Sequence, residues 1–191
     1  MKLFIAEKPS LAKAIAEEIG VKSRSGGSIV CNNDTVVTWC FGHLLEQAEP
    51  DEYLPDGIPL TSKGKKRWRL KDLPIFPKEW VVEPKNDAGV TRQLKLIGEL
   101  IGRAETVVNA GDPDREGQLL VDEVIEHFGC TKPVERFWVS AVDPASIRKG
   151  LKDLRGNARY AGMRDAARAR SRADWLLGMN LSRAYTLLNK V

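Results

Sequence analysis

Short apolar runs and amphipathic segments alternate along most of the chain. Apolar runs rich in β-branched residues predict strands, and apolar residues spaced three or four apart predict helices. The predicted strands cover 2–6, 106–110 and 135–140, with further β structure near 28–31, 35–41 and 79–84. The predicted helices cover 10–19, 88–102, 116–128 and 144–153. Strands that alternate with helices in this way indicate an α/β domain.

Two segments interrupt this pattern. Between Glu46 and Pro84 the chain is rich in Pro, Gly and charge, which predicts an insertion with little regular structure. Gly156-Asn157 marks an expected boundary, and about 157–189 is expected to be helical. We therefore expect a first domain over 1–153 and the start of a second, helical domain over 157–191.

The strand predicted over 106–110 ends in three carboxylates, Asp112, Asp114 and Glu116. An extended backbone points Asp112 and Asp114 the same way, because they are two residues apart. Three carboxylates so close together repel one another unless a cation or a basic group lies among them. Mg²⁺ is the simplest such cation, since it binds a few carboxylates together with water and substrate phosphate. Open α/β sheets bind their ligands at this edge.

Two other interpretations of the acidic cluster stay open at this point. With Glu123 as a last ligand, the acidic spacing nearly fits the calcium loop of an EF-hand. Against calcium, the segment before Asp112 has the pattern of a strand, and residues 118–124 continue as helix. The cluster is also compatible with a purely structural role in capping the helix.

Glu7 and Lys8 follow the first predicted strand, so they fall on the same edge of the sheet as the acidic cluster. A solvated surface acid is the plain alternative for Glu7. Together with the cluster, however, the pair supplies an acid, a cation and a metal site, which are the parts that phosphoryl transfer uses.

Composition narrows the classes of protein to consider. No apolar run reaches 18 residues and no signal peptide is present, so we expect a soluble intracellular protein without a membrane partner. Cys31, Cys40 and Cys130 are scattered, which indicates buried thiols and neither a zinc site nor a disulfide framework. The phosphate-binding motif G-x-x-x-x-G-K-[ST] does not occur, so nothing points to ATP.

Positive charge is concentrated near the C-terminus, although the formal net charge is only +4. Arg164, Arg168 and Arg172 recur every four residues and would line one face of a helix, with Arg170 off that row. A solvated basic face is the alternative, but the cluster favours contact with a phosphate backbone. Basic residues also surround Trp68 in the segment 63–69, which suits either single-strand stacking or an exposed flexible loop.

Motifs in four places resemble the TOPRIM domain of type IA DNA topoisomerases, and most closely its bacterial topoisomerase III branch. One carboxylate motif would be a weak signal, because primases, type II topoisomerases and some nucleases share it. Four motifs in the order of the family, spanning nearly the whole chain, are specific. They are Glu7-Lys8-Pro9-Ser10, Thr38–Glu46, Gly111–Gly117 and Asp174–Ala184.

The resemblance implies a TOPRIM fold with a central parallel sheet flanked by helices, and it implies roles for individual residues. Glu7 would be the general acid and base, Lys8 would stabilise charge on the phosphate, and the three carboxylates would hold Mg²⁺. His43 and Arg115 would face the site without an assigned chemical step. A packed structural role stays the alternative for His43, and compensation of the acidic cluster stays the alternative for Arg115. His127, next to Phe128, is expected to be structural. The resemblance also implies that 157–191 is the truncated start of a helical DNA-binding domain. The single-stranded DNA contacts implied are Arg168, Arg170, Arg172 and Arg183.

The family's nucleophile is a tyrosine in a separate downstream domain, and the chain departs from the family here. Tyr53, Tyr160 and Tyr185 are its only tyrosines, and none lies in the nucleophile motif. We therefore expect an N-terminal piece of an ATP-independent bacterial topoisomerase, inactive alone, that works in the cytoplasm at the nucleoid with the remaining domains of the enzyme.

Two alternatives of different classes stay open. A self-contained TOPRIM nuclease or primase-like enzyme would use the same carboxylates, but those families are not expected to carry the Asp174–Arg183 motif. A non-catalytic DNA-binding module rests only on the basic C-terminal part.

Overall fold

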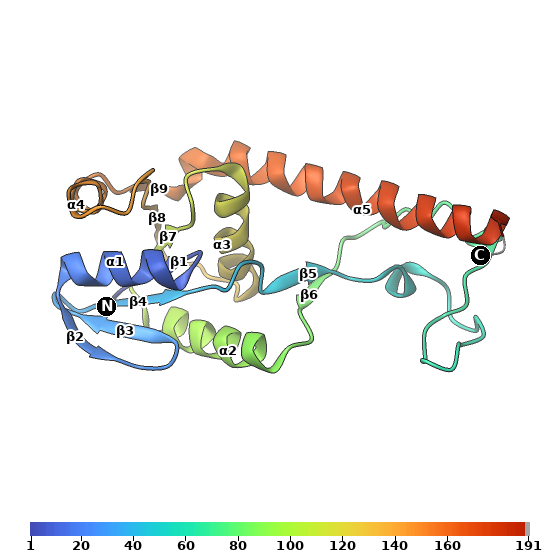
Figure 1. Ribbon diagram of the computed structural model, residues 1–191, viewed down its shortest axis with the longest axis horizontal. Helices are drawn as coiled ribbons and strands as arrows, with labels where there is room; N and C mark the ends of the chain where they lie inside the picture. The colour runs from blue at the N-terminus through green and yellow to red at the C-terminus, as the bar shows by residue number, and fades with distance from the viewer. Residues whose placement is uncertain (190–191) are drawn as a thin grey trace. The chain divides into compact units, whose positions relative to one another are not determined.

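The computed structural model describes residues 1–189 and divides the chain into two compact units (Figure 1). Unit 1 consists of Met1–Leu45 and Pro84–Ala167. Unit 2 consists of Glu46–Glu83 and the segment that begins at Arg168. Helix α5 (Ala161–Asn189) begins in unit 1 and continues into unit 2.

Unit 1 is built on a seven-stranded sheet in the order β2-β3-β4-β1-β7-β8-β9. The strands are β1 (Lys2–Ala6), β2 (Val21–Arg24), β3 (Ser28–Cys31), β4 (Thr35–Trp39), β7 (Thr106–Ala110), β8 (Val134–Arg136) and β9 (Arg155–Gly156). The four central strands β4, β1, β7 and β8 are parallel, and the outer strands pair antiparallel. Ala6 is level with both Trp39 and Ala110, so the carboxyl ends of β4, β1 and β7 lie side by side.

Helices cover both faces of this sheet, because alternate residues of a strand point to opposite sides. Leu3 and Ile5 of β1 pack in one core with apolar residues of α2 (Ala88–Arg103) and α3 (Arg115–His127). Phe4 and Ala6 pack in a second core with residues of α1 (Pro9–Ile19) and α4 (Pro144–Lys152). The expected sheet flanked by helices is therefore confirmed, with antiparallel strands added at its edges.

Unit 2 holds the expected insertion together with most of α5. A two-stranded ribbon of β5 (Leu45–Gln47) and β6 (Val82–Pro84) closes the insertion, which otherwise contains only the short 3-10 turns Pro50–Tyr53 and Leu70–Asp72. Tyr53, Trp80 and Trp175 meet edge to face with ring centroids 5.4–6.4 Å apart. The Trp175 indole N–H donates to the carbonyl of Ala48 at 3.0 Å.

The described structure departs from the expected elements in a few places. The strand expected over 135–140 ends at Arg136, and the strand expected over 79–84 is limited to β6. The expected boundary near 153–157 differs from the observed division, which lies between Ala167 and Arg168 and groups the insertion with α5. The aromatic contacts of Trp175 with Tyr53 and Trp80 account for this grouping.

Candidate active site

Glu7, Lys8 and Asp112 meet at the carboxyl edge of the sheet, as their positions after two neighbouring parallel strands require. Glu7 and Lys8 follow β1, and Asp112 lies two residues beyond β7. The Asp112 backbone N–H donates to Glu7 Oε2 at 3.0 Å. Lys8 Nζ donates to Asp112 Oδ2 at 2.6 Å, and this hydrogen bond raises the pKa of Lys8. Lys8 is therefore protonated at neutral pH and is paired with Asp112.

Asp114 and Glu116 lie at the start of helix α3. Asp114 is the N-cap residue, and its Oδ1 accepts the backbone N–H of Gly117 at 2.7 Å. Glu116 lies in the first turn, where a negative charge is favoured by the helix dipole. Arg115 Nε is 3.6 Å from Glu116 Oε1, and both side chains are about half exposed. Asp114 thus caps helix α3, as the capping interpretation of the cluster predicts for this residue.

The EF-hand interpretation is excluded by the backbone around Asp112. The segment Thr106–Ala110 is strand β7, where an EF-hand has a helix, and Glu123 lies in the middle of α3.

Two glycines let the loop after β7 approach helix α3 and Glu7. A Cβ atom at Gly117 would lie 2.6 Å from the backbone N and O of Asp112 and 2.7 Å from Glu7 Oε2. A Cβ atom at Gly111 would lie 2.0 Å from the carbonyl oxygen of Gly117. No side chain fits at either position without moving the backbone that carries the acids.

Arg136 binds the loop that follows β7 through its main-chain carbonyls, and the sequence analysis did not predict this role. Its side chain is fully buried; Nη1 donates to the carbonyls of Asn109, Gly111 and Phe137, and Nη2 donates to that of Asp112 at 2.7 Å. Burial lowers the pKa of Arg136 to about 10. The side chain therefore stays charged at neutral pH beneath the acidic cluster. A charged residue inside the apolar run 134–139 is the signal that could have identified it.

A buried polar network on β7 and α3 fixes the other side of the loop. Asn109 Oδ1 accepts the backbone N–H of Gly111 at 2.9 Å, and Asn109 Nδ2 donates to Asp122 Oδ1 at 2.8 Å. Asp122, which is 3% exposed, also accepts hydrogen bonds from Gln118 and Asn157. These residues lie inside apolar elements, and the sequence analysis did not single them out.

The carboxylates fit Mg²⁺ by their chemistry but are not gathered into a preformed ligand set. Within residues 1–189, no three His, Cys, Asp or Glu side chains lie close enough together to hold a metal ion. Lys8 engages one oxygen of Asp112, and the N-terminus of α3 engages one oxygen of Asp114. A divalent cation would have to displace or join these contacts.

The two histidines and three cysteines lie in different surroundings. His43 Nδ1 lies 3.8 Å from Glu123 Oε2, and the preceding Gly42 N–H donates to the carbonyl of Glu7 at 3.5 Å. His127 contacts Phe128 edge to face. Cys31 and Cys40 are buried free thiols and Cys130 is a half-buried one, and burial raises the pKa of Cys40 to about 12.

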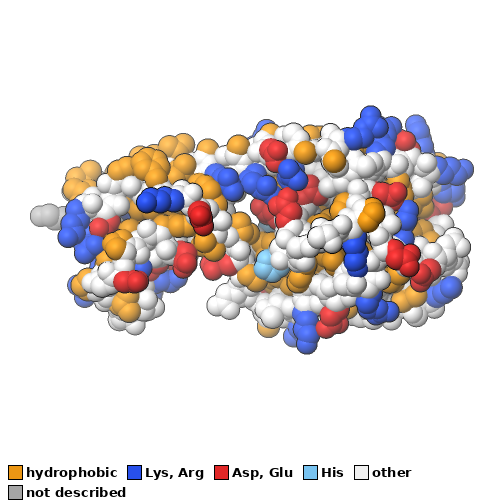
Figure 2. All heavy atoms as spheres, turned by 180° about the vertical axis from the view of Figure 1, so that it is seen from behind, with side chains coloured by type: hydrophobic (Ala, Val, Ile, Leu, Met, Phe, Trp, Pro, Cys, Tyr) orange, Lys and Arg blue, Asp and Glu red, His pale blue; other side chains and the backbone are white. Residues whose placement is uncertain are grey.

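The candidate DNA-contacting arginines all lie on the part of α5 that belongs to unit 2. Arg170 is exposed and lies 3.7 Å from Asp174, whereas Arg168 is half-buried. The guanidinium carbons of Arg172 and Arg183 lie 5.2 and 4.5 Å from the ring centroids of Trp80 and Trp68. Lys and Arg side chains are interspersed with Asp and Glu over the face shown in Figure 2, without one continuous basic patch.

No helix in the described part of the chain combines the length and apolar character that crossing a membrane requires.

Comparisons with a protein-family model and with curated proteins agree on one family. The Toprim domain family matches residues 2–142. The chain is 47% identical to a protein of Haemophilus influenzae named DNA topoisomerase 3, over 98% of the chain and 28% of that protein. It is 37% identical to DNA topoisomerase 3 of Staphylococcus aureus, over 96% of the chain and 25% of that protein.

A solved structure of full-length topoisomerase I from Thermotoga maritima is also similar, with a TM-score of 0.46 and 20% identity over 81% of this chain and 21% of that one. The chain spans about a quarter of the length of the curated relatives it matches.

Proposed function

This chain belongs to the Toprim domain family, and on that premise we propose that it is the N-terminal, Mg²⁺-binding part of a type IA DNA topoisomerase. The observation that carries the proposal is the contact of Glu7 and Lys8 with Asp112 across two parallel strands. The relatives named DNA topoisomerase 3, which match nearly the whole chain, support it. The complete enzyme would cleave and rejoin single-stranded DNA in the bacterial cytoplasm, at the nucleoid, without ATP.

Glu7 is the proposed proton donor and acceptor. In the proposed reaction, a tyrosine from the remaining domains loses its phenol proton to solvent, attacks a phosphodiester and forms a bond to the 5′ phosphate. The bond from that phosphate to the 3′ oxygen breaks. Glu7 Oε2 accepts the Asp112 N–H, so we assign the proton transferred to the leaving 3′ oxygen to Oε1. The same carboxylate would take the proton back when the strand is resealed.

Lys8 is the proposed stabiliser of negative charge on the reacting phosphate. Its ammonium is held beside Glu7 and Asp112 by the 2.6 Å contact to Asp112, so it is positioned before the substrate arrives. A cation placed in advance costs no reorganisation at the moment of reaction. When phosphate binds, Lys8 would exchange its Asp112 partner for a phosphate oxygen.

Asp112, Asp114 and Glu116 are the proposed ligands of Mg²⁺. The bound ion would supply positive charge that positions the cleaved ends for rejoining. Arg136 fixes the backbone of Asp112 whether or not the ion is present, because it donates to main-chain carbonyls.

The proposed single-strand contacts are Arg168, Arg170, Arg172 and Arg183, with His43 and Arg115 facing the site. Arg172 and Arg183 are held over indole rings. Because their guanidinium groups are already restricted, they lose less conformational entropy when they bind phosphate.

Incubation of this chain with end-labelled single-stranded DNA and Mg²⁺ tests the proposal. We expect intact DNA and no covalent adduct after denaturation. The Tyr53 hydroxyl is engaged by the backbone of Val81, and the Tyr160 ring is stacked on Trp138. Tyr185 is exposed, so the Tyr185→Phe variant is the control. Free cut ends that disappear in Asp112→Asn would show a self-contained Toprim nuclease and overturn the proposal.

A further inference from the structure

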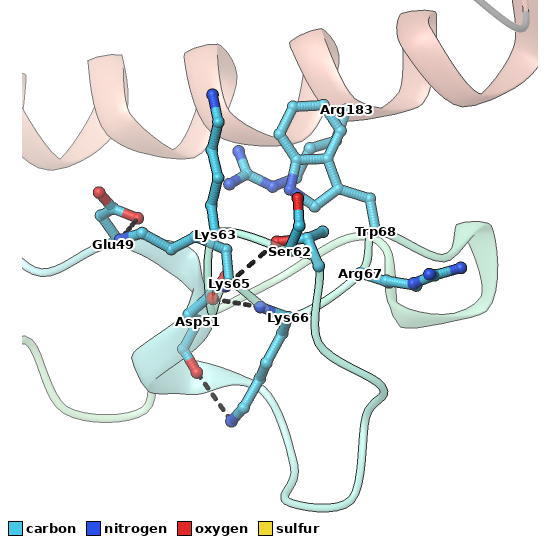
Figure 3. A pocket seen from close by; sticks show the side chains of 10 residues that line it. Glu49, Asp51, Ser62, Lys63, Lys65, Lys66, Arg67, Trp68 and Arg183 are labelled. Atoms are coloured by element: carbon cyan, nitrogen blue, oxygen red, sulfur yellow. Dashed lines mark hydrogen bonds and ion pairs between the residues drawn. The ribbon is translucent and has the colours of Figure 1, made fainter.

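A pocket of about 670 Å³ opens in unit 2 between the loop around residues 61–68 and helix α5 (Figure 3). Both elements belong to unit 2. This volume lies within the range of pockets that hold small organic ligands. Five basic side chains and two acids line it, together with the indole of Trp68.

Arg183 and Trp68 form one wall of the pocket. The Arg183 guanidinium carbon lies 4.5 Å from the Trp68 ring centroid, and the Arg183 side chain is 8% exposed. Its Nη1 donates to the carbonyl of Met179, whereas its Nε is buried without a hydrogen-bond partner among the described residues. Trp68 is 42% exposed, so the indole presents aromatic surface to the pocket while Arg183 braces it.

The acids of the pocket are already engaged. Glu49 pairs with Lys65 Nζ at 2.5 Å, and Asp51 Oδ2 accepts the backbone N–H of Lys66 at 2.6 Å. The Lys66 ammonium donates to the main-chain carbonyls of Asp51 and Leu54.

Lys63 is left as an available cation at the rim, since its side chain forms no ion pair within residues 1–189. Figure 3 shows Lys63 and Trp68 extending from the loop toward the same side, whereas Arg67 points away.

We propose that this pocket binds one nucleotide of single-stranded DNA, with the base stacked on Trp68 and the adjoining phosphate bound by Lys63. An exposed indole beside an unpaired ammonium matches the two parts of a nucleotide, an aromatic face and an anion. The inference rests on the proposed function only in taking single-stranded DNA as the substrate. It adds a base-stacking position in the insertion, built from other residues than those proposed to carry out cleavage.

Binding of a fluorescein-labelled oligothymidylate to the full 191-residue chain, measured by fluorescence anisotropy, tests the stacking. We expect Trp68→Ala to raise the Kd about thirtyfold, the middle of the range for the loss of one base stack. Trp68→Phe should restore most of the affinity. Phe76→Ala removes an exposed aromatic ring of unit 2 that does not line the pocket, and it should leave the Kd unchanged.

The salt dependence of the same Kd tests the phosphate contact. Lys63→Ala should lower the slope of log Kd against log salt concentration by about 0.7, as the loss of one phosphate contact on a single strand requires. Lys13→Ala, an exposed lysine of α1, should leave the slope unchanged. Circular dichroism melting of each variant confirms that it is folded.

Free deoxythymidine monophosphate and an oligomer containing 5-iodouracil complete the test. A photo-crosslink that maps to Trp68 or its loop supports the proposal. An unchanged Kd in Trp68→Ala, an equal loss in Phe76→Ala, or free monophosphate binding as tightly as the oligomer would overturn it. None of these results bears on whether Glu7 takes part in strand cleavage, so the two proposals fail separately.

Discussion

At the scale of single residues, the candidate site depends on the close approach of helix α3 to the loops that carry its acids. Gly117 brings the first turn of α3 within contact of both Asp112 and Glu7, which come from different strands. The close approach of Glu7 and Asp112 to α3 therefore depends on the absence of a side chain at Gly117.

Gly117→Ala should lower the free energy of unfolding by about 1–3 kcal/mol, the usual cost of overpacking a closely fitted position. The reason is that a Cβ atom would lie 2.6 Å from the Asp112 backbone. Urea unfolding measures the change. Gly102→Ala on α2 is the matched control, since no atom lies within 4 Å of its added Cβ. Equal stability of the two variants would contradict this packing argument.

Arg136 is the residue whose removal should cost most. Arg136→Met keeps an unbranched apolar stem but removes the side-chain donor to four carbonyls. The carbonyls of Asn109 and Asp112 each keep a backbone N–H, whereas those of Gly111 and Phe137 lose the Arg136 donor. We expect a loss of about 3–5 kcal/mol in the free energy of unfolding, as for other broken buried charged contacts. Arg136→Lys should recover only part of it, because one ammonium cannot replace both Nη groups. A loss below about 1 kcal/mol, within the range of one ordinary hydrogen bond, would contradict the role.

At the scale of elements, the pattern of apolar residues predicted the strands and helices that are buried. β1 and β7 coincide with the predicted segments 2–6 and 106–110, because every second residue enters one of the two cores. β2 and β9 were missed since they are short, exposed edge strands whose residues carry no hydrophobic pattern. β8 is shorter than expected because it ends at Arg136, whose side chain turns toward the acidic loop.

The caps of the helices are testable at this scale. The Asp143 side chain accepts the backbone N–H of Ser146 at 3.0 Å at the start of α4, and hydrogen bonds from Ser146 lower the pKa of Asp143. This stability is present above the unfolded-state pKa and is lost as pH falls through the lower folded-state pKa. Asp143→Ala should therefore lower the Tm at pH 6 more than at pH 3.

Asp143→Asn keeps an acceptor for the cap and is the control for that measurement. At pH 6, the Tm should decrease less in Asp143→Asn than in Asp143→Ala. Identical Tm differences at both pH values for Asp143→Ala would show that the charge of Asp143 contributes nothing to the helix.

At the scale of the whole molecule, the sequence could predict which residues meet at the sheet edge but not what supports them. Glu7, Lys8 and Asp112 follow two predicted strands, and the carboxyl ends of neighbouring parallel strands lie at the same edge of the sheet. The contacts of Asn109, Asp122 and Arg136 depend on the packing of three elements, and polar residues inside apolar runs give no sign of their partners. The capping contact of Asp114 and the Lys8–Asp112 ion pair are further contacts that the spacing of the carboxylates did not predict.

The most direct test joins this chain to the domains it would work with. The chain replaces the matching N-terminal segment of the Haemophilus influenzae relative, and the chimera is incubated with 3′-end-labelled single-stranded DNA, then denatured. We expect a covalent protein–DNA adduct that Glu7→Gln reduces at least about a hundredfold, the lower range for a general acid. Glu17→Gln, an exposed acid of α1, should behave as the unmodified chimera. Near-normal adduct in Glu7→Gln, or none in a folded chimera, would contradict the account.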